Sequence, residues 1–517
     1  MMKRLISIIL AAVSLGCIAR AEDIAVKTPI PFGLDLDINA EYRWAPGGIV
    51  LVEGGTQYMS GIDLERDYFD IPPLARLAMG AGGPQGLSVA IETTFRPQWT
   101  GNWGAATNLP YLSGNKGFEN YFLTRGVAYW RSPDFSVAFG RDPVDYGGIL
   151  YGSLLPSTRL PYLDNIRMQG KLGSFTADWM AATIPAVMNW QGANYDVNPN
   201  QGDSNGGTDY FGWQGDSASA NPTSIIEVLN RYSWTIHDFV IGVSDHAMIA
   251  RRNNCFDITD FLPMASRHQT ADAQTNNSLI FDAAWHPIEG LKLAAQYGLD
   301  DIDANFIGIP DTSAPTMPAF VAGAEYRGRT TLGALSAYGE VGYTHWDWGN
   351  YSGNEMAPDD VDPLMRMQYR YDTVNGALLL PLTSPYGPGA LWFQANVSQD
   401  IGTTGLNVGA QLLLLQKNEG ANLINYSDYL YPAGTTTPVV VDSDGYLGIP
   451  ECNGPYVYFG QLSFPVTFTY SCWQVVVSPS VICRNWAWSG EVDFVASYHL
   501  RSGDHSAVAV RPWAAPY

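Results

Sequence analysis

Residues 34–44 alternate strictly between apolar and polar side chains, beginning with Leu34-Asp35-Leu36-Asp37-Ile38. Successive side chains of a β-strand point to opposite faces, so this run predicts a strand with one apolar and one polar face. A tilted strand needs about 9–11 residues to cross a membrane, whereas strands of soluble proteins usually have about 5–6. The length of the run therefore favours a membrane-spanning strand.

The same alternation recurs along the chain, and the connections between runs differ systematically in length. Further alternating runs occupy 87–96, 291–300, 406–414, 456–470 and 492–500. Short connections are expected at 82–86, 132–134, 173–174, 237–238, 287–290, 329–333, 402–405 and 471–472. Long segments rich in Gly, Asn, Asp, Ser and Pro fall at about 97–120, 142–164, 185–228, 248–278, 301–318, 347–389 and 417–455. Short turns at one rim and long loops at the other are typical of an outer-membrane barrel.

These hairpins predict an all-β fold, a transmembrane antiparallel up-and-down β-barrel of about 18 strands over residues 34–500, with long extracellular loops and short periplasmic turns. Closure removes the sheet edges that hydrocarbon cannot tolerate. A soluble β-sandwich or propeller would explain the strands but not the long alternations. Tryptophans near the expected strand ends are candidates for the interfacial girdles, namely Trp44, Trp130, Trp285, Trp346, Trp392, Trp473 and Trp486.

The N-terminal residues 1–21 have the features of a secretory signal peptide. Lys3 and Arg4 precede a short apolar core, and Ala19-Arg20-Ala21 supplies a cleavage site. An alternative is acylation at Cys17. Export predicts location in the outer membrane of a Gram-negative cell, in contact with outer-membrane lipids and lipopolysaccharide. Residues 22–33 would form a periplasmic lead segment, and 501–517 a tail or terminal strand whose last residue, Tyr517, the barrel-assembly machinery would read.

Composition and motifs exclude several classes of function. A net charge of −22 makes nucleic acid an unsuitable partner. After residue 21 no apolar run approaches the roughly 20 residues of a membrane helix. Common catalytic motifs are missing, and the triplet Ser244-Asp245-His246 would alternate between the two faces of a strand. We therefore expect no enzyme, no metal site and no cofactor; the acidic runs at 300–303 and 359–362 are interpreted as solvated loops.

The segment 139–168 contains three arginines in a Gly- and Tyr-rich stretch. Arg141 and Arg167 would leave the ends of neighbouring strands, with Arg159 between them. Arginine binds carboxylates in a bidentate manner, so these residues are candidates for binding acidic groups of a glycan. The alternative is that they pair with Asp142, Asp145 and Asp164 and hold a loop inside the lumen.

This segment resembles the signature stretch of the Wzi-type capsule-assembly family. The resemblance lies in Gly140-Arg141, Tyr146-Gly147-Gly148, Gly152 to Ser157 and Arg159-Leu160-Pro161. The Gly-Arg opening is also similar to alginate-export-type barrels. The resemblance implies an eighteen-stranded outer-membrane barrel that holds capsular polysaccharide at the cell surface.

Aromatic residues are dense in the expected long loops. Flat rings beside amides and carboxylates suit sugar binding, although loops that pack on one another need the same residues. The leading prediction is binding or assembly of a surface or capsular polysaccharide, and the alternative is a porin for sugars or cations. The candidate glycan-binding residues are Arg141, Arg159, Arg167, Tyr146, Tyr151, Tyr162, Trp99 and Trp103.

Overall fold

A computed structural model of the chain describes residues 32–45, 52–53, 72–83, 86–96, 102–103, 107–109, 123–184, 224–251, 274–300, 317–346, 348–349, 367–373, 376–418 and 456–503. The expected signal peptide, most of the lead segment and residues 504–517 lie outside these ranges. No helix in the described ranges is long and apolar enough to cross a membrane.

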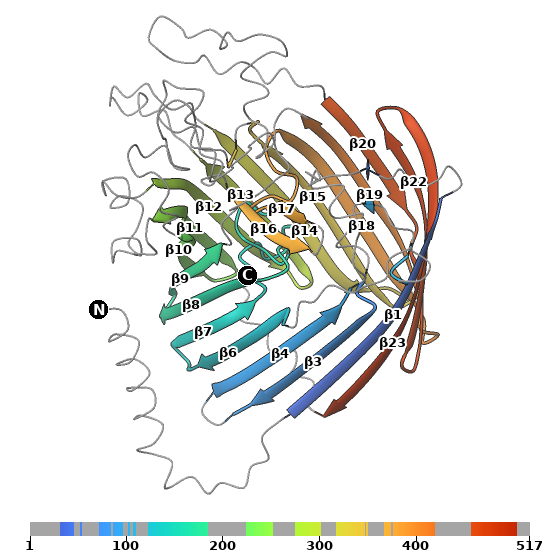
Figure 1. Cartoon of the computed structure of the whole chain (residues 1–517), viewed down its shortest axis with the longest axis horizontal. Helices are drawn as coiled ribbons and strands as arrows, with labels where there is room; N and C mark the ends of the chain where they lie inside the picture. The colour runs from blue at the N-terminus through green and yellow to red at the C-terminus, as the bar shows by residue number, and fades with distance from the viewer. Residues whose placement is uncertain are drawn as a thin grey trace, which may run out of the picture.

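The described chain is built from β-strands (Figure 1). The main sheet contains β1 (Phe32–Trp44), β3 (Ala75–Gly82), β4 (Leu87–Phe95), β6 (Arg125–Arg131), β7 (Phe135–Asp142), β8 (Leu163–Leu172), β9 (Phe175–Ile184), β10 (Ser224–Ile236), β11 (Phe239–Arg251), β12 (Gln274–Ile288), β13 (Leu291–Leu299), β14 (Pro318–Arg329), β15 (Ala334–Thr344), β18 (Ala390–Ile401), β19 (Leu406–Asn418), β20 (Tyr456–Ser463), β21 (Val466–Tyr470), β22 (Trp473–Arg484) and β23 (Ala487–Gly503). Two small pairs stand apart, β2 (Val52–Glu53) with β5 (Asn102–Trp103) and β16 (Gln368–Thr373) with β17 (Gly376–Pro381).

The main sheet closes into a ring in which all neighbours are antiparallel. The first strand pairs with the last, in a register that runs from Gly33 opposite Gly503 to Trp44 opposite Val492. β20 and β21 share one position, because both pair with β19 and β22 and Phe464-Pro465 interrupts the ladder between them. Proline has no N–H to donate, which explains the interruption. The molecule is therefore a closed barrel of eighteen strand positions, as the sequence predicts.

The eight predicted short connections all lie at strand junctions at one end, here called the short-turn end. The two-residue link His237-Asp238, for example, joins β10 to β11, with His237 at a positive φ of 54°. The opposite end is called the long-loop end. One connection there is short, because β22 and β23 are joined through Asn485-Trp486, both at positive φ.

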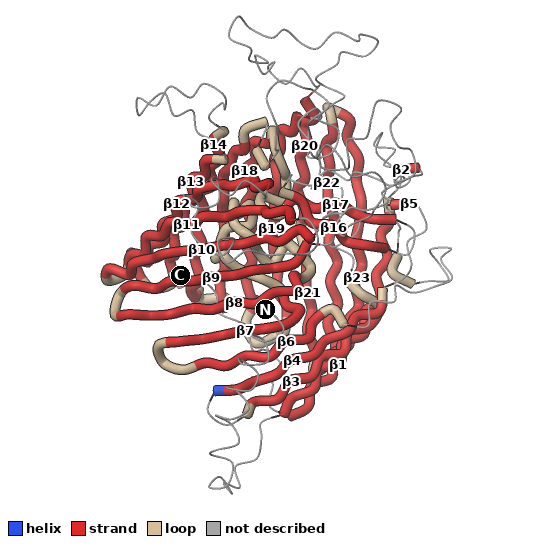
Figure 2. The backbone as a smooth tube through the Cα atoms, turned by 60° about the vertical axis from the view of Figure 1, so that its left-hand side comes forward, coloured by secondary structure: helices blue, strands red, loops and turns tan. Residues whose placement is uncertain are grey.

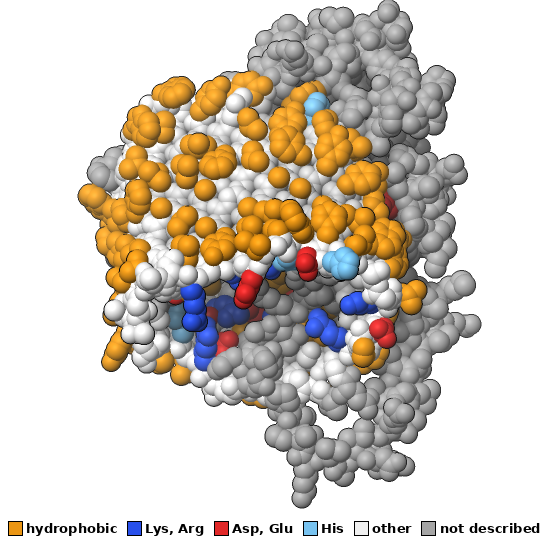
Figure 3. All heavy atoms as spheres, turned by 180° about the vertical axis from the view of Figure 1, so that it is seen from behind, with side chains coloured by type: hydrophobic (Ala, Val, Ile, Leu, Met, Phe, Trp, Pro, Cys, Tyr) orange, Lys and Arg blue, Asp and Glu red, His pale blue; other side chains and the backbone are white. Residues whose placement is uncertain are grey.

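Side chains alternate along each strand so that the barrel wall is apolar on its outer face and polar on its lumen face, the reverse of a soluble protein. On β1, Ile38, Tyr42 and Trp44 are about half exposed on the outer face. Asn39, Glu41 and Arg43 alternate with them and are buried on the lumen side. Large apolar side chains cover the outer wall (Figure 3). An apolar exterior around a polar interior is the arrangement of a membrane-spanning barrel.

The girdle prediction is only partly right. Trp44, Trp130, Trp285 and Trp473 are exposed, at 38–55% of their surface, as membrane-facing residues should be. Trp392 is only 1% exposed and points into the lumen, so its assignment to the girdle is wrong. Strand parity decides this, since Leu391 and Phe393 occupy the outer face.

Candidate functional site

The lumen contains an apolar plug made by two inward-folded segments. One is residues 143–162, between β7 and β8, and the other is the β16–β17 hairpin with the chain that follows it (Figure 1). Leu154, Leu155 and Tyr386 from these segments are at most 2% exposed. They share one buried cluster with wall residues on β9 to β12, β14, β18 to β20 and β22. Figure 2 shows loop segments behind the strands of the wall.

Glu340 on β15 anchors the tip of the first segment. Its carboxylate accepts hydrogen bonds from the backbone N–H of Tyr151 at 2.7 Å and of Gly152 at 3.0 Å. Trp392 Nε1 and Gln394 Nε2 also donate to Glu340, at 2.7 and 3.0 Å. A buried carboxylate is costly unless its lone pairs are satisfied, and here several donors satisfy them.

Close packing makes glycine necessary at this contact. A Cβ on Gly152 would lie 2.3 Å from Cζ2 of Trp392, and one on Gly342 would lie 2.1 Å from the same atom. Both distances are far below van der Waals contact, so the indole fits only between two residues without side chains. A further anchor lies next to it, where the Leu154 N–H donates to Gln296 Oε1 at 2.7 Å.

The hairpin segment is also fixed by polar contacts. Trp348 Nε1 donates to Thr383 Oγ1 at 3.1 Å, and the Lys417 ammonium donates to the Pro388 carbonyl. Tyr369 packs edge-on against Tyr162, with ring centroids 6.3 Å apart. Burial raises the pKa of the Tyr369 hydroxyl above its usual value.

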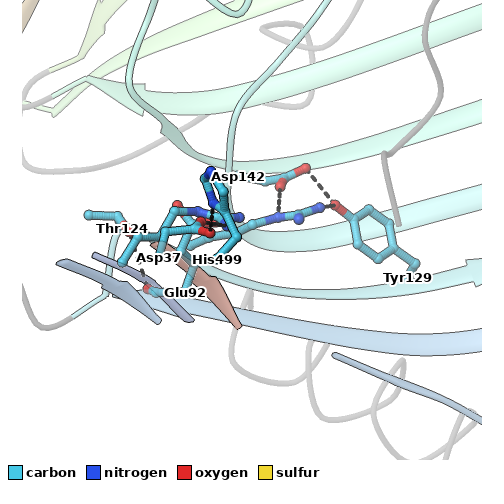
Figure 4. A network of polar contacts seen from close by, with 8 residues as sticks. Asp37, Glu92, Thr124, Tyr129, Asp142 and His499 are labelled. Carbon is cyan, nitrogen blue, oxygen red and sulfur yellow. Dashed lines mark hydrogen bonds and ion pairs between the residues drawn. The ribbon is translucent and has the colours of Figure 1, made fainter. Parts of the chain in front are cut away.

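The wall on the other side of the ring is charged. Arg76 on β3 bridges Asp37 on β1 at 2.9 Å and Glu92 on β4 at 2.6 Å, and Asp37 also bonds His499 Nδ1 at 2.7 Å. Figure 4 shows that Asp37, Glu92 and His499 lie together, with Asp142 and Tyr129 further along the wall. The apolar cluster includes no residue of β23, β1, β3, β4 or β6. The plug thus packs against one part of the ring only, although buried ion pairs such as Arg231–Asp282 lie on that part as well.

Asp142, at the end of β7, connects the charged wall to the plug. Its carboxylate accepts from Arg125 Nε at 2.7 Å, from the Tyr129 hydroxyl at 2.6 Å and from Arg167. Asp142 is fully buried and Arg167 is 1% exposed. The chain enters the lumen immediately after this residue.

The candidate residues taken from the sequence lie in different surroundings. Arg141 forms a bidentate pair with Asp164, both contacts at 2.7 Å, and its guanidinium lies 4.2 Å from the centroid of the Tyr162 ring. The guanidinium of Arg159, which is exposed, lies 3.0 Å from the centroid of Tyr151. Arg141 and Arg167 therefore bind two of the aspartates that the alternative interpretation names.

Burial separates the remaining candidates. Arg167 and Tyr146 are each 1% exposed, so neither can contact a ligand directly as predicted; both instead help to hold the plug. Tyr162 is 7% exposed, and Tyr151 is intermediate. Trp103 lies in β5, but its side chain and the whole of Trp99 are outside the described residues.

Sequence reasoning missed Arg76, Arg125 and Glu340 as organisers of the lumen, whereas the alternative interpretation of segment 139–168 named Asp142. The signal that could have found them is the alternation of residues along each strand between the outer face and the lumen face. Glu92 and Glu340, for instance, occupy the same face as the small or polar residues of their strands. Charged residues on that face of a barrel strand must point into the lumen.

The short-turn end of the lumen is hollow, and charged side chains line it (Figure 3). A pocket of about 810 Å³ lies there against β14, β15, β18 and β19. In the described part of the chain, no three His, Cys, Asp or Glu side chains gather to hold a metal ion.

Comparison with known proteins shows similarity at the level of the fold. No family model matches the chain, and no curated protein matches it. Among solved structures, it is similar to Wzi, an outer-membrane carbohydrate-binding β-barrel involved in group 1 capsule assembly in Escherichia coli. The identity is 13%, coverage is 94% of this chain and 87% of Wzi, and the TM-score is 0.47.

Pseudomonas aeruginosa OprD is also similar, at 10% identity, with 91% of this chain and 95% of OprD covered and a TM-score of 0.39. P. aeruginosa OccK2 in complex with glucuronate is similar at 9% identity, with 91% and 98% covered and a TM-score of 0.40. Scores this low do not bear on function, and the barrel is established by its own strand pairing.

Proposed function

We propose that this chain is an outer-membrane barrel that binds a surface polysaccharide and is not a wide diffusion pore. The plug is the observation that carries the proposal. It packs against wall strands from β9 to β22, and Glu340 and Gln296 hold its tip. An eighteen-stranded ring without such a plug would be wide enough for an aqueous channel. The proposal assigns no catalytic role and needs no cofactor.

The chemistry of the exposed groups supports an acidic glycan as the ligand. Arg141 lies at the long-loop end, and its partner Asp164 has 48% of its side chain exposed. Exposed ion pairs contribute only about 0–1 kcal/mol, so a carboxylate on a sugar can compete for this guanidinium. Tyr162 and the Arg159–Tyr151 pair supply further guanidinium and ring surfaces, and Trp99 and Trp103 remain part of the proposal.

The direct test is binding of purified acidic polysaccharide to the detergent-solubilised barrel. Replacing Arg141 and Arg159 together with alanine should weaken binding about tenfold or more, since two charge-assisted contacts are lost. Arg96→Ala, just after β4, is the matched control and should bind normally. Barrel folding is checked by heat-modified migration in gels. Unchanged affinity in the double variant would contradict the assignment of the site.

A narrow channel is the second candidate, and the charged wall favours it. The sector from β23 to β6 carries ion pairs and is not part of the apolar cluster. A polar path along this wall would pass small sugars or cations. Planar-bilayer recording distinguishes the two: steady conductance supports the channel, and closed traces exclude it.

A further inference from the structure

Four neutral polar side chains lie side by side on the lumen face of β15, β18 and β19. Asn396 on β18 is directly opposite Gln411 on β19, and Ser398 on β18 is directly opposite Ser336 on β15. They alternate with outer-face residues such as Val397, which is 46% exposed, so all four point into the lumen. The group, here called the neutral patch, consists of Ser336, Asn396, Ser398 and Gln411.

The neutral patch lies where the lumen becomes accessible to water, on the short-turn side of the plug. Nearer the long-loop end of β18, Trp392 faces the lumen but is only 1% exposed, because it packs with the plug. Asn396 and Gln411 face the same lumen and are exposed. Tyr338, opposite Asn396, accepts a hydrogen bond from the N–H of Tyr151 at the plug tip, at 3.0 Å. A ligand that enters between the short turns therefore reaches the patch next to the plug.

The side chains of the neutral patch keep their full hydrogen-bonding capacity. In the part of the chain that the structure describes, none of the four forms a hydrogen bond or an ion pair. Nearby amides differ, since Gln394 donates to Glu340 at 3.0 Å and Asn407 donates to Asp400 at 2.7 Å. Amides and hydroxyls can both donate and accept, and opposite side chains on neighbouring strands have Cβ atoms about 5 Å apart. A small ligand can therefore contact two or more members of the patch at once.

The pocket at the short-turn end gives the patch charged neighbours of both signs. It has a volume of about 810 Å³, and Ser336 and Ser398 are among its lining residues. Two arginines and two acidic residues also line it, namely Arg327, Arg329, Glu289 and Asp400. Their formal charges cancel, so the pocket favours neither an anion nor a cation. Selection of a ligand is then left to hydrogen bonds with the neutral side chains.

We infer that the neutral patch binds uncharged sugar residues at the end of an oligosaccharide that enters from the short-turn end. Sugar hydroxyls donate and accept, as amides do, so one sugar ring can bond Asn396 and Gln411 together. The patch contains no apolar side chain, which suits a ligand covered with hydroxyls better than a peptide. In an outer-membrane barrel the short-turn end faces the periplasm. The inference does not depend on the proposed acidic-glycan site at Arg141, which lies at the long-loop end.

The test is calorimetric titration of the full-length detergent-solubilised protein with maltotetraose, cellotetraose and mannotetraose. At least one of these neutral sugars should bind with a Kd of about 1 mM or tighter. Asn396→Leu combined with Gln411→Met nearly preserves volume but removes the hydrogen bonds, and should weaken binding about tenfold. Gln474→Met, on the lumen face of β22 outside the patch, is the control and should bind normally. The inference is overturned if no sugar binds, if the patch variant binds as well as the wild type, or if the control loses as much affinity.

Further measurements identify the chemistry of the occupant. Sugar affinity should be the same at about 0.05 M and about 0.5 M salt, because salt screens only charged contacts. A marked loss at high salt would show that charged side chains hold the ligand, against the assignment to the neutral patch. N-acetyl-tetraglycine amide should bind more weakly than the sugar; equal affinity would mean that the occupant is an uncharged peptide. Arg141→Ala should bind the neutral sugars normally, so a failure of the acidic-glycan site is recognised separately.

Discussion

Asp142 is the residue on which the charged wall most depends. It is fully buried, and it pairs with Arg125 and Arg167 while accepting a hydrogen bond from the Tyr129 hydroxyl. Removing one partner of a buried pair leaves an uncompensated charge, which costs about 3–5 kcal/mol. Asp142→Asn should lower the free energy of unfolding by about that amount. Urea titration in lipid vesicles, followed by tryptophan fluorescence, measures it.

Asp164→Asn is the matched control for Asp142→Asn. Asp164 also pairs with an arginine, but its side chain is 48% exposed and water screens the interaction. The expected loss is about 0–1 kcal/mol. Similar losses for both variants would show that the burial of Asp142 has no special cost.

Among the elements, the segment between β7 and β8 depends on the contact of Gly152 with Trp392, which leaves no room for a side chain at position 152. Gly152→Val would force the segment away from Trp392, because a Cβ there would lie 2.3 Å from the indole. We expect the displaced plug to raise single-channel conductance several-fold in planar bilayers. Gly170→Val on β8 is the control, since nothing lies within 4 Å of its Cβ. Equal conductance for the two variants would mean that this segment does not close the lumen.

The strands and turns were predictable, and the plug was not. Alternating runs and Gly- or Asp-containing links such as Gly173-Ser174 are local signals, and each matches a junction in the barrel. The β16–β17 hairpin was assigned to a long loop, because the residue pattern of the hairpin does not show that it packs inside the barrel. Trp392 was assigned to the girdle because it lies near a strand end, although the alternation along β18 places it on the lumen face.

The sequence draws attention to the stretch 139–168 but does not show the surroundings of its residues. Burial separates Arg167 from Arg159, although both were named as candidates for the same role. Long-range contacts such as Gly152 with Glu340 decide that burial, and no local sequence pattern encodes them.

At the scale of the whole molecule, the apolar outer face and the polar lumen face predict different losses of unfolding free energy when a residue is replaced by arginine. Val341 on β15 is 41% exposed on the outer face. Val341→Arg would place a charge in hydrocarbon and should cost about 2–4 kcal/mol of unfolding free energy. Asn396→Arg, on the lumen side of β18, should change it by less than about 1 kcal/mol. Urea titration of both variants in vesicles is the measurement, and equal losses would contradict a lipid-facing outer wall.

The seam between β1 and β23 joins residues that are more than four hundred positions apart, as the Arg43–Asp493 pair illustrates. Until the last strand has been synthesised, the growing sheet has two unpaired edges that attract other strands. The incomplete chain must therefore be kept from aggregating until its last strand is available. Ring closure, and with it a sealed lumen, can only be a late event in biogenesis.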